Sequence, residues 1–231
     1  NLFKSKNEYN VVIITSKIYT SNHTFSYTNN RSVYSSKERF LQTINTIESI
    51  KKYIPNYYII LFDNSNFTQE ESGILNNSVD FFINIKNDEE INYYTNKCKI
   101  KALGELTQLK IILKYMKVLK INIKNVFKIT GRYYVFEKFN YEQYNNDLNI
   151  FKKNINVSDR EFYYTSFYKI AYKNIILFNN CIKICIDFIK KENKPYELET
   201  LLPNKFNYNF KVIDDLGIKQ IIAVNNDMSP I

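Results

Sequence analysis

Apolar and polar residues form alternating blocks of strand and helix length in the N-terminal part of the chain. Residues 10–16 (NVVIITS) and 57–65 (YYIILFDNS) are apolar runs that end in small or polar residues, which is typical of buried strands. Between them, a capping box at Ser35 and Glu38 opens an amphipathic helix over 39–54. The order strand, helix, strand predicts a βαβ unit whose strands pair in parallel.

The same alternation continues as far as residue 135. A second capping box opens a short helix at 68–72, and it is followed by a strand at 79–85, a long helix at 101–120 and a strand at 125–135. These elements predict an α/β fold with a Rossmann-like, mixed but mainly parallel sheet flanked by helices.

The remaining residues mix strand and helix patterns less regularly. Residues 160–173 alternate like a strand, 174–193 have the pattern of a helix, and a second helix is expected to start at Pro195. The short apolar runs at 210–214 and 218–224 have strand character. This part of the chain is therefore expected to be α+β.

Length and composition favour a folded domain. Hydrophobic residues make up 45% of the chain and include 17 Phe and 20 Tyr, which is enough to build a core. A length of 231 residues fits one domain. We expect a single domain over 1–231, with an α/β half at 1–135 and an α+β half at 136–231.

The residues of the sequence show no targeting or membrane signal, and a targeting segment before Asn1 stays open. No apolar stretch reaches the roughly 18 to 20 residues of a membrane helix, and the first residues lack the apolar centre of a signal peptide. Cys98, Cys181 and Cys185 form no CxxC pair, so buried, reduced thiols are expected. We expect a cytoplasmic protein without a transmembrane segment.

The net charge of +9 favours an anionic partner without choosing one. Nucleic acid, an anionic membrane surface and a phosphorylated substrate all fit this charge. The Lys residues are spread along the whole chain and form no block of five or more. A solvated surface explains them equally well.

Arginine is more informative than lysine in this chain. Asn, Ile, Lys and Tyr supply 114 of 231 residues, a bias that makes each Lys uninformative, whereas there are four Arg. An Arg retained against this bias suits a position where a planar fork binds phosphate or carboxylate. We select Arg31 and Arg132 as ligand contacts and leave Arg160 as a surface residue. The alternative is that each Arg packs its stem over aromatic rings.

Three strand ends carry candidate ligand-binding residues. In open parallel sheets, ligands bind beyond the carboxyl ends of the strands. Three apolar runs end in small or polar residues at such positions. The alternative explanation is that any strand becomes polar where it leaves the core. The candidates are Thr15, Ser16, Lys17, Asp63, Asn64, Ser65, Lys128, Thr130, Gly131 and Arg132.

The start of the long helix supplies a further candidate site. Lys101, Gly104 and Glu105 lie in its opening residues, where a helix N-terminus favours anions and a glycine permits close approach of a ligand or another backbone. Such a site suits a diphosphate. It is neither a GxxxxGK[ST] phosphate loop nor a GxGxxG dinucleotide motif, because both patterns are absent.

Carboxylates near Pro195 are candidates for a catalytic base. Glu199 is the first choice and Glu197 the second, although acidic residues in a first helical turn also serve only to balance the helix dipole. The sequence contains no Asp-x-Asp motif, so no residues are assigned to a metal.

The order of these parts resembles a GT-A-type nucleotide-sugar glycosyltransferase. The strand ending ILFDNS, the basic helix entrance KIKALGEL and the strand VFKITGRYYV occupy the places where that family binds a nucleotide, a diphosphate and a metal. RSVYSSKERFLQTINTIESIKKYIPNYYIILFDNS and KITGRY also resemble uncharacterised glycosyltransferase-like proteins of large DNA viruses and some bacteria. The resemblance covers roughly residues 10 to 135 and rests mainly on element order.

This resemblance implies transfer of a sugar from a nucleotide-sugar donor to a hydroxyl group of a glycan or protein acceptor. It implies that Arg132, Lys101 and Arg31 stabilise the departing diphosphate and that Asp63 holds the nucleoside. Glu199 or Glu197 would then deprotonate the acceptor. Such an enzyme would act in glycan biosynthesis, in host cytoplasm or a virion if the source is viral.

The sequence departs from the family at the metal site. Gly131 and Arg132 stand where relatives carry the acidic motif that binds Mn²⁺ or Mg²⁺, and a cation there could replace the metal. With this departure, the resemblance implies transfer without a metal, and Mn²⁺ or Mg²⁺ stays open as the alternative. Two other functions stay open: a basic nucleic-acid-binding protein, and a catalytically silent virion or scaffold domain with a transferase-like fold.

Overall fold

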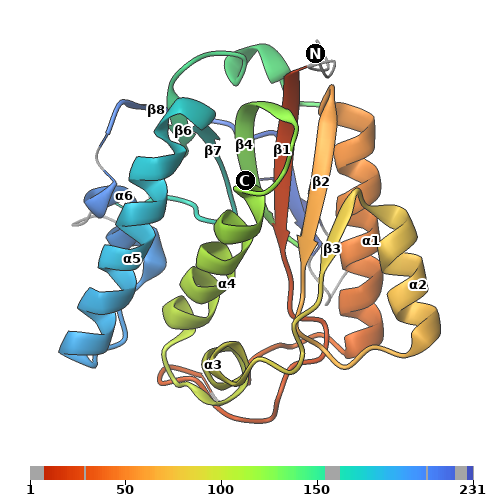
Figure 1. Cartoon of the computed structure of the whole chain (residues 1–231), viewed down its shortest axis with the longest axis vertical. Coiled ribbons are helices and arrows are strands. Elements are labelled where there is room, and N and C mark those ends of the chain that lie inside the picture. The colour runs from red at the N-terminus through yellow and green to blue at the C-terminus, as the bar shows by residue number, and fades with distance from the viewer. Residues whose placement is uncertain (1–7, 29, 154–161, 207, 222–227, 231) are drawn as a thin grey trace.

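A seven-stranded mixed sheet forms the centre of the structure (Figure 1). The computed structural model describes residues 8–28, 30–153, 162–206, 208–221 and 228–230. Four strands pair in parallel and three more extend the sheet beyond an antiparallel step at β7. In spatial order they are β3 (Phe81–Ile83), β2 (Tyr57–Phe62), β1 (Glu8–Thr15), β4 (Asn122–Thr130), β7 (Phe167–Ala171), β6 (Asn149–Phe151) and β8 (Phe210–Val212).

Helices cover both faces of this sheet (Figure 1). On one face lie α1 (Ser36–Tyr53) and α2 (Gln69–Ser78). On the other lie α4 (Lys101–Met116), α5 (Ile175–Glu192) and α6 (Leu198–Lys205). The short α3 (Glu89–Asn92) leads through a π-helical turn, Tyr93–Lys97, toward α4. The predicted α/β fold with a mainly parallel sheet is confirmed.

Local sequence signals explain where several elements begin. The Ser35 hydroxyl accepts from the Glu38 amide while the Glu38 carboxylate accepts from the Ser35 amide, so the predicted capping box opens α1. Thr68 and Glu71 open α2 in the same way. Parallel pairing of β1 with β2 confirms the predicted βαβ unit. The three cysteines are free and buried.

The strand predicted over 125–135 is wrong, because this segment forms two strands in two different sheets. β4 ends at Thr130, the chain turns at Gly131 and Arg132, and β5 (Tyr133–Val135) then pairs with β9 (Ile218–Ile221). β10 (Met228–Pro230) completes this second sheet. The sequence pattern does not reveal this turn, because apolar residues lie on both sides of it. The partner of β5 is β9, a strand far along the chain.

Other element bounds are narrower than the sequence predicted. The helix expected to reach residue 120 ends at Met116, since the residues after it are mostly exposed and Val118 has no core to face. The helix expected from Pro195 begins at Leu198, because Glu197 is still extended. The predicted strand at 160–173 is reduced to β7, and Arg160 lies outside the described residues.

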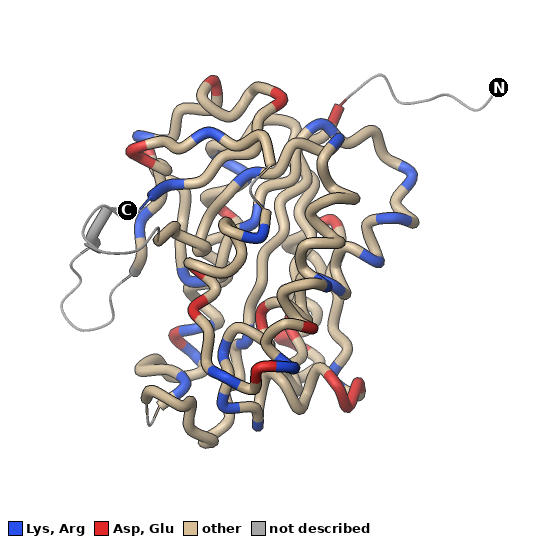
Figure 2. Tube along the Cα trace, turned by 90° about the vertical axis from the view of Figure 1, so that its left-hand side faces the viewer, with Lys and Arg blue, Asp and Glu red and all other residues tan. Residues whose placement is uncertain are grey.

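Charge is distributed widely over the fold. Figure 2 shows Lys and Arg along most parts of the traced chain, with Asp and Glu among them. Within the described ranges, no helix combines the length and apolar character needed to cross a bilayer.

Candidate functional site

The ends of three strands meet at one edge of the main sheet. Thr15, the last residue of β1, pairs with Phe62 of β2 and Thr130 of β4. The chain continues this alignment past the strands, since the Ser16 amide donates to the Phe62 carbonyl at 2.9 Å and the Gly131 amide to the Thr15 carbonyl at 3.0 Å. The predicted strand-end residues therefore leave the sheet together.

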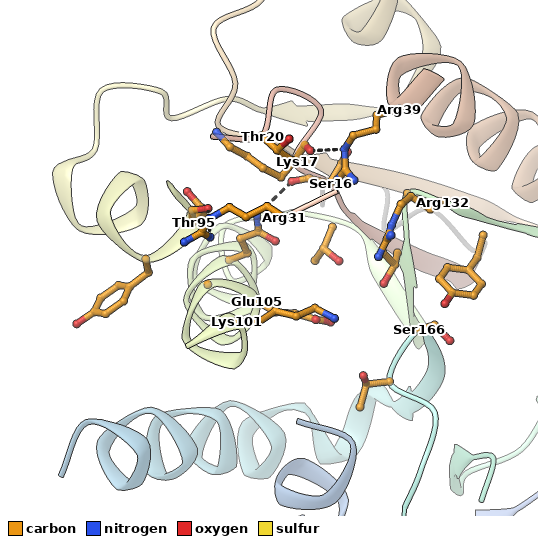
Figure 3. Close-up of a pocket in the computed structure, with 18 of the residues that line it drawn as sticks. Ser16, Lys17, Thr20, Arg31, Arg39, Thr95, Lys101, Glu105, Arg132 and Ser166 are labelled. Carbon is orange, nitrogen blue, oxygen red and sulfur yellow. Dashed lines mark hydrogen bonds between the residues drawn. The ribbon is translucent and has the colours of Figure 1, made fainter. Parts of the chain in front are cut away.

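A polar cavity of about 170 Å³ opens at this edge, and we call it the basic pocket (Figure 3). Eleven of its lining residues were predicted from the sequence: Thr15, Ser16, Lys17, Arg31, Lys101, Gly104, Glu105, Thr130, Gly131, Arg132 and Glu199. Nine more were not: Thr20, Phe25, Arg39, Tyr94, Thr95, Gln108, Tyr133, Thr165 and Ser166. Taking both groups together, five of the lining side chains are cationic and two are carboxylates.

Hydroxyl groups of α1 hold the segment that carries Arg132. The Thr43 hydroxyl lies 3.3 Å from the Gly131 carbonyl oxygen, and the Thr46 hydroxyl donates to the Tyr133 carbonyl at 2.7 Å. One turn further along, Ser49 Oγ accepts from the Val135 amide at 3.0 Å. Positions 43, 46 and 49 share one helix face, so α1 fixes every second residue of this segment.

Gly131 allows the close contact on which this arrangement depends. A Cβ atom at this position would lie 3.1 Å from Thr43 Oγ1 and 3.2 Å from Ser16 Cβ. The ends of β1 and β4 and the Thr43 side chain of α1 therefore meet with almost no space between them. Glycine is suited to such close approach.

Two guanidinium groups face the pocket from different elements (Figure 3). Arg39, on α1, is 8% exposed, and it donates through Nε to the Lys17 carbonyl at 2.7 Å and through Nη1 to Ser32 Oγ at 3.0 Å. Burial, followed by the nearby charge of Arg132, lowers the pKa of Arg39 to about 10. Arg132 Nε is buried and has no hydrogen-bond partner in the described part of the chain. An anion between these groups would relieve their repulsion.

Arg31 lines the pocket but uses its donors to hold a loop. Its guanidinium donates to the backbone carbonyls of His23 and Thr95 at 2.8 and 2.9 Å, and to that of Cys98. It also lies over the Phe25 ring, 4.1 Å from the centroid. Arg31 thus fastens the loop after β1 to the segment before α4 and adds positive charge at the wall of the pocket.

Lys17, which is half-buried, and Asp63, which is fully buried, are opposite charges in the loops that follow β1 and β2. Asp63 is fully buried and does not line the basic pocket. Its carboxylate accepts from the Ile18 amide at 2.8 Å and from the Ser65 amide at 2.7 Å. Burial lowers the pKa of Lys17, and the Asp63 carboxylate opposes that shift. Asp63 and Ser65 therefore shape the loops, and Lys17 reaches the pocket.

Lys128 lies beneath the pocket and ties three elements together. Its ammonium group contacts the Glu105 carboxylate of α4 and donates to Thr130 Oγ1 at 2.9 Å and the Thr165 carbonyl at 2.6 Å. Burial lowers the pKa of Lys128, and Glu105 opposes this shift. Gly104, beside Glu105, faces the Tyr94 carbonyl, which would lie 3.0 Å from an added Cβ.

Glu199 lies at the wall of the basic pocket. It belongs to the first turn of α6, and its Oε1 accepts from the Thr165 hydroxyl at 3.2 Å. Thr165 is also the residue whose carbonyl accepts from Lys128. Glu197 does not line the basic pocket and lies in a neighbouring cavity.

Two further cavities adjoin the basic pocket. The first, of about 470 Å³, shares Lys17 and Thr20 with it. We call it the amide cavity, because its wall includes Asn64, Asn66, Asn92 and Asn96. The second, of about 410 Å³, shares Lys101, Glu105 and Glu199 with the basic pocket, and we call it the aromatic cavity after Tyr27, Phe162 and Tyr196 in its wall. The three cavities thus form a row.

The residues of the basic pocket do not fit a divalent cation. In the described ranges no three His, Cys, Asp or Glu side chains come together as a metal-binding group. The two carboxylates at the pocket are Glu105, which is paired with Lys128, and Glu199. A cation between them would also face Lys101 and Arg132, and Mg²⁺ and Mn²⁺ prefer sites rich in free oxygen ligands.

Comparison with known proteins identifies the fold. The sequence matches no protein-family model and no curated protein. One similar solved structure is a glycosyltransferase involved in the glycosylation of the major capsid of PBCV-1, at 10% identity and a TM-score of 0.46, over 89% of this chain and 81% of that one.

The glycosyltransferase GlyE of Streptococcus pneumoniae TIGR4 is also similar. One structure of it matches at 10% identity and a TM-score of 0.50, over 90% of this chain and 45% of GlyE. Its apo form matches at 12% identity and a TM-score of 0.52, over 89% and 45%. The chain thus spans less than half the length of GlyE. Together with the mixed, mainly parallel sheet, this likeness shows that the chain has a glycosyltransferase-like fold of the GT-A type.

Proposed function

We propose that this chain transfers a glycosyl group from a nucleotide sugar to an acceptor hydroxyl group, with the donor diphosphate bound in the basic pocket. The observation that carries this proposal is the pair formed by Arg39 and Arg132. Neither guanidinium has a carboxylate partner within 4.0 Å among the described residues, although both face the cavity at the strand ends. A diphosphate supplies the missing negative charge and accepts bidentate hydrogen bonds.

The row of cavities fits the parts of such a donor. The amide cavity offers Asn side chains, which can donate and accept hydrogen bonds to a nucleobase or ribose. Asn64 lines this cavity, and its Oδ1 atom is buried without a hydrogen-bond partner among the described residues. A nucleoside in the amide cavity places the diphosphate at the cations and the transferred sugar toward Glu105 and Glu199.

The proposed chemistry uses charge already present in the pocket. As the bond between the anomeric carbon and the diphosphate oxygen breaks, negative charge grows on the diphosphate, where Arg132, Arg39 and Lys101 stabilise it. The acceptor oxygen forms the new bond to the anomeric carbon, and its proton passes to the Glu199 carboxylate. Thr165 orients Glu199 through the hydrogen bond at 3.2 Å. No divalent metal takes part in this proposal.

Binding of nucleoside diphosphates in the presence of EDTA tests the proposal. Thermal denaturation with UDP, GDP, CDP and dTDP, and with their sugars, should reveal a nucleotide that raises the melting temperature. Arg132→Lys keeps the charge but loses the fork, and should weaken binding by about 10- to 100-fold, the equivalent of about 1.4 to 2.7 kcal/mol.

Matched variants separate geometry from net charge. Arg132→Met removes a pocket charge, and Lys183→Met removes one from the exposed face of α5. Only the first should abolish binding. Equal losses in both would indicate long-range attraction instead of a site, and no shift with any nucleotide would favour nucleic-acid binding or a catalytically silent domain.

A further inference from the structure

The aromatic cavity is a second cavity beside the one proposed to bind the donor diphosphate. It lies between the start of α4, the loop at Ser26 and Tyr27, and the segment from Pro195 to Glu199. Its volume of about 410 Å³ falls within the range of small-ligand pockets. Because Glu199 and Glu105 line both cavities, a ligand in this cavity would meet the basic pocket at these carboxylates.

The charges of the two cavities differ in a way that selects different ligands. Apart from Lys101 at the junction, the aromatic cavity contains no cation among its described lining residues, and it carries Glu105, Glu197 and Glu199. A second phosphate or another anion would be repelled there. A neutral ligand rich in hydroxyl groups would instead donate hydrogen bonds to the carboxylates.

Two aromatic rings of this cavity are held in place by other rings. Tyr27 is 65% exposed, yet it stacks on Phe25 with an interplanar angle of 7° and a centroid distance of 5.8 Å. Arg31 covers the same Phe25 ring at 4.1 Å. Across the cavity, Tyr196 packs on Phe188 at 4.9 Å. Fixed aromatic rings beside carboxylates suit a pyranose, which has apolar C–H faces and an equatorial rim of hydroxyl groups.

We propose that the aromatic cavity binds a carbohydrate acceptor and delivers one of its hydroxyl groups to Glu199. This inference rests on the proposed function, and it names the acceptor as a sugar instead of a protein side chain. The acceptor oxygen bonds to the anomeric carbon of the donor sugar, the diphosphate leaves with the electrons of the broken bond, and Glu199 takes the acceptor proton. Tyr27 and Tyr196 bind the acceptor without contacting the diphosphate.

Two measurements on Tyr27→Ala and Tyr196→Ala test this inference. In transfer assays with mono- and oligosaccharide acceptors, each variant should raise the acceptor KM at least tenfold while the Kd for the nucleoside diphosphate stays within twofold of the original. Tyr172→Ala is the control, because Tyr172 is also exposed but follows Ala171, whose partner Asn125 lies at the opposite edge of the sheet.

Saturation-transfer NMR with the same saccharides provides a readout that needs no turnover. If the original protein binds a saccharide and Tyr196→Ala does not, the inference is supported, even if the protein accepts none of the nucleotide sugars as a donor. Donor binding without saccharide binding, or transfer to peptides alone, overturns it and leaves the proposed function standing. An unchanged acceptor KM in both variants also overturns it.

Discussion

Replacing Lys128 with Met tests whether the buried ion pair holds the pocket together. The side chain of Lys128 is 2% exposed and that of Glu105 19%, so the variant leaves a largely buried carboxylate without its cation. Thr130 Oγ1 and the Thr165 carbonyl each lose a donor as well. Breaking a buried pair by removing one partner costs about 3 to 5 kcal/mol, and partial access of water to Glu105 favours the lower end, about 3 kcal/mol.

Thermal and urea denaturation measure this loss directly. For a chain of this size, about 3 kcal/mol lowers the melting temperature by roughly 6 to 12 °C. Adding Glu105→Gln to Lys128→Met removes the unpaired charge and should restore more than half of the lost free energy of unfolding. Lys190→Met breaks an exposed pair with Glu90 at 3.3 Å and should change stability by less than about 1 kcal/mol.

Two results would refute this reasoning. If Lys128→Met is as stable as the original protein, the ion pair contributes nothing. If the double variant is no more stable than the single one, the loss arises from packing of the lysine stem and not from the unpaired carboxylate.

Three further predictions concern pH, glycine and metal. Burial lowers the pKa of Lys169 from 10.5 to about 8, so the unfolded chain binds more protons than the folded chain between these pH values. The free energy of unfolding, measured by urea denaturation and compared with that of Lys169→Met, should therefore rise by up to about 1.4 kcal/mol per pH unit in this range. A difference between the two proteins that does not change with pH would contradict this. Gly217→Ala should destabilise the protein by at least about 2 kcal/mol, because φ is 67° and the new Cβ would lie 2.4 Å from Phe139 Cα. Gly73→Ala, which has open space on α2, should stabilise the protein by about 0.5 to 1 kcal/mol. If the two variants shifted the melting temperature in the same direction, these two predictions would be contradicted. Nucleoside diphosphate affinity measured by calorimetry should be equal in EDTA and in Mn²⁺, and binding that requires Mn²⁺ would contradict the assignment of Arg132.

The sequence predicts those parts of the site that follow from local patterns. Apolar runs with polar ends identify β1, β2 and β4, and the parallel βαβ rule brings their ends to one edge. The same rule accounts for Lys17 and Arg132 lining one pocket although they are far apart in the chain. Glu199 is a candidate from the sequence because it is a carboxylate at the opening of a helix, and it lines the same pocket.

Contacts between distant segments explain what the sequence did not reveal. The face of α1 that meets the segment from Gly131 to Val135 is polar, because Thr43, Thr46 and Ser49 form hydrogen bonds with the backbone of that segment. The apolar spacing of α1 does not show which distant segment its polar face meets. For the same reason the sequence does not show that Arg39, on this helix, lines the basic pocket. The rarity of arginine was its one available signal.

Asp63 and Lys128 illustrate a related difficulty. Both are ionisable residues at or near strand ends, and the sequence cannot distinguish a ligand contact from a buried charge with protein partners. The Asp63 carboxylate accepts from the Ile18 amide and Lys128 contacts the Glu105 carboxylate, and both of these partners are distant in sequence. Only the folded chain supplies this information.

Release of a nucleoside diphosphate from nucleotide sugars is the measurement that tests the central claim most directly. The protein is incubated in EDTA with UDP-, GDP- and dTDP-sugars, with and without saccharide acceptors, and the product is quantified by chromatography. We predict release from at least one donor, stimulation by a saccharide, and a loss of about 10²- to 10⁴-fold in Glu199→Gln. No release from any donor, by a protein that also fails to bind the free nucleoside diphosphates, would contradict the claim.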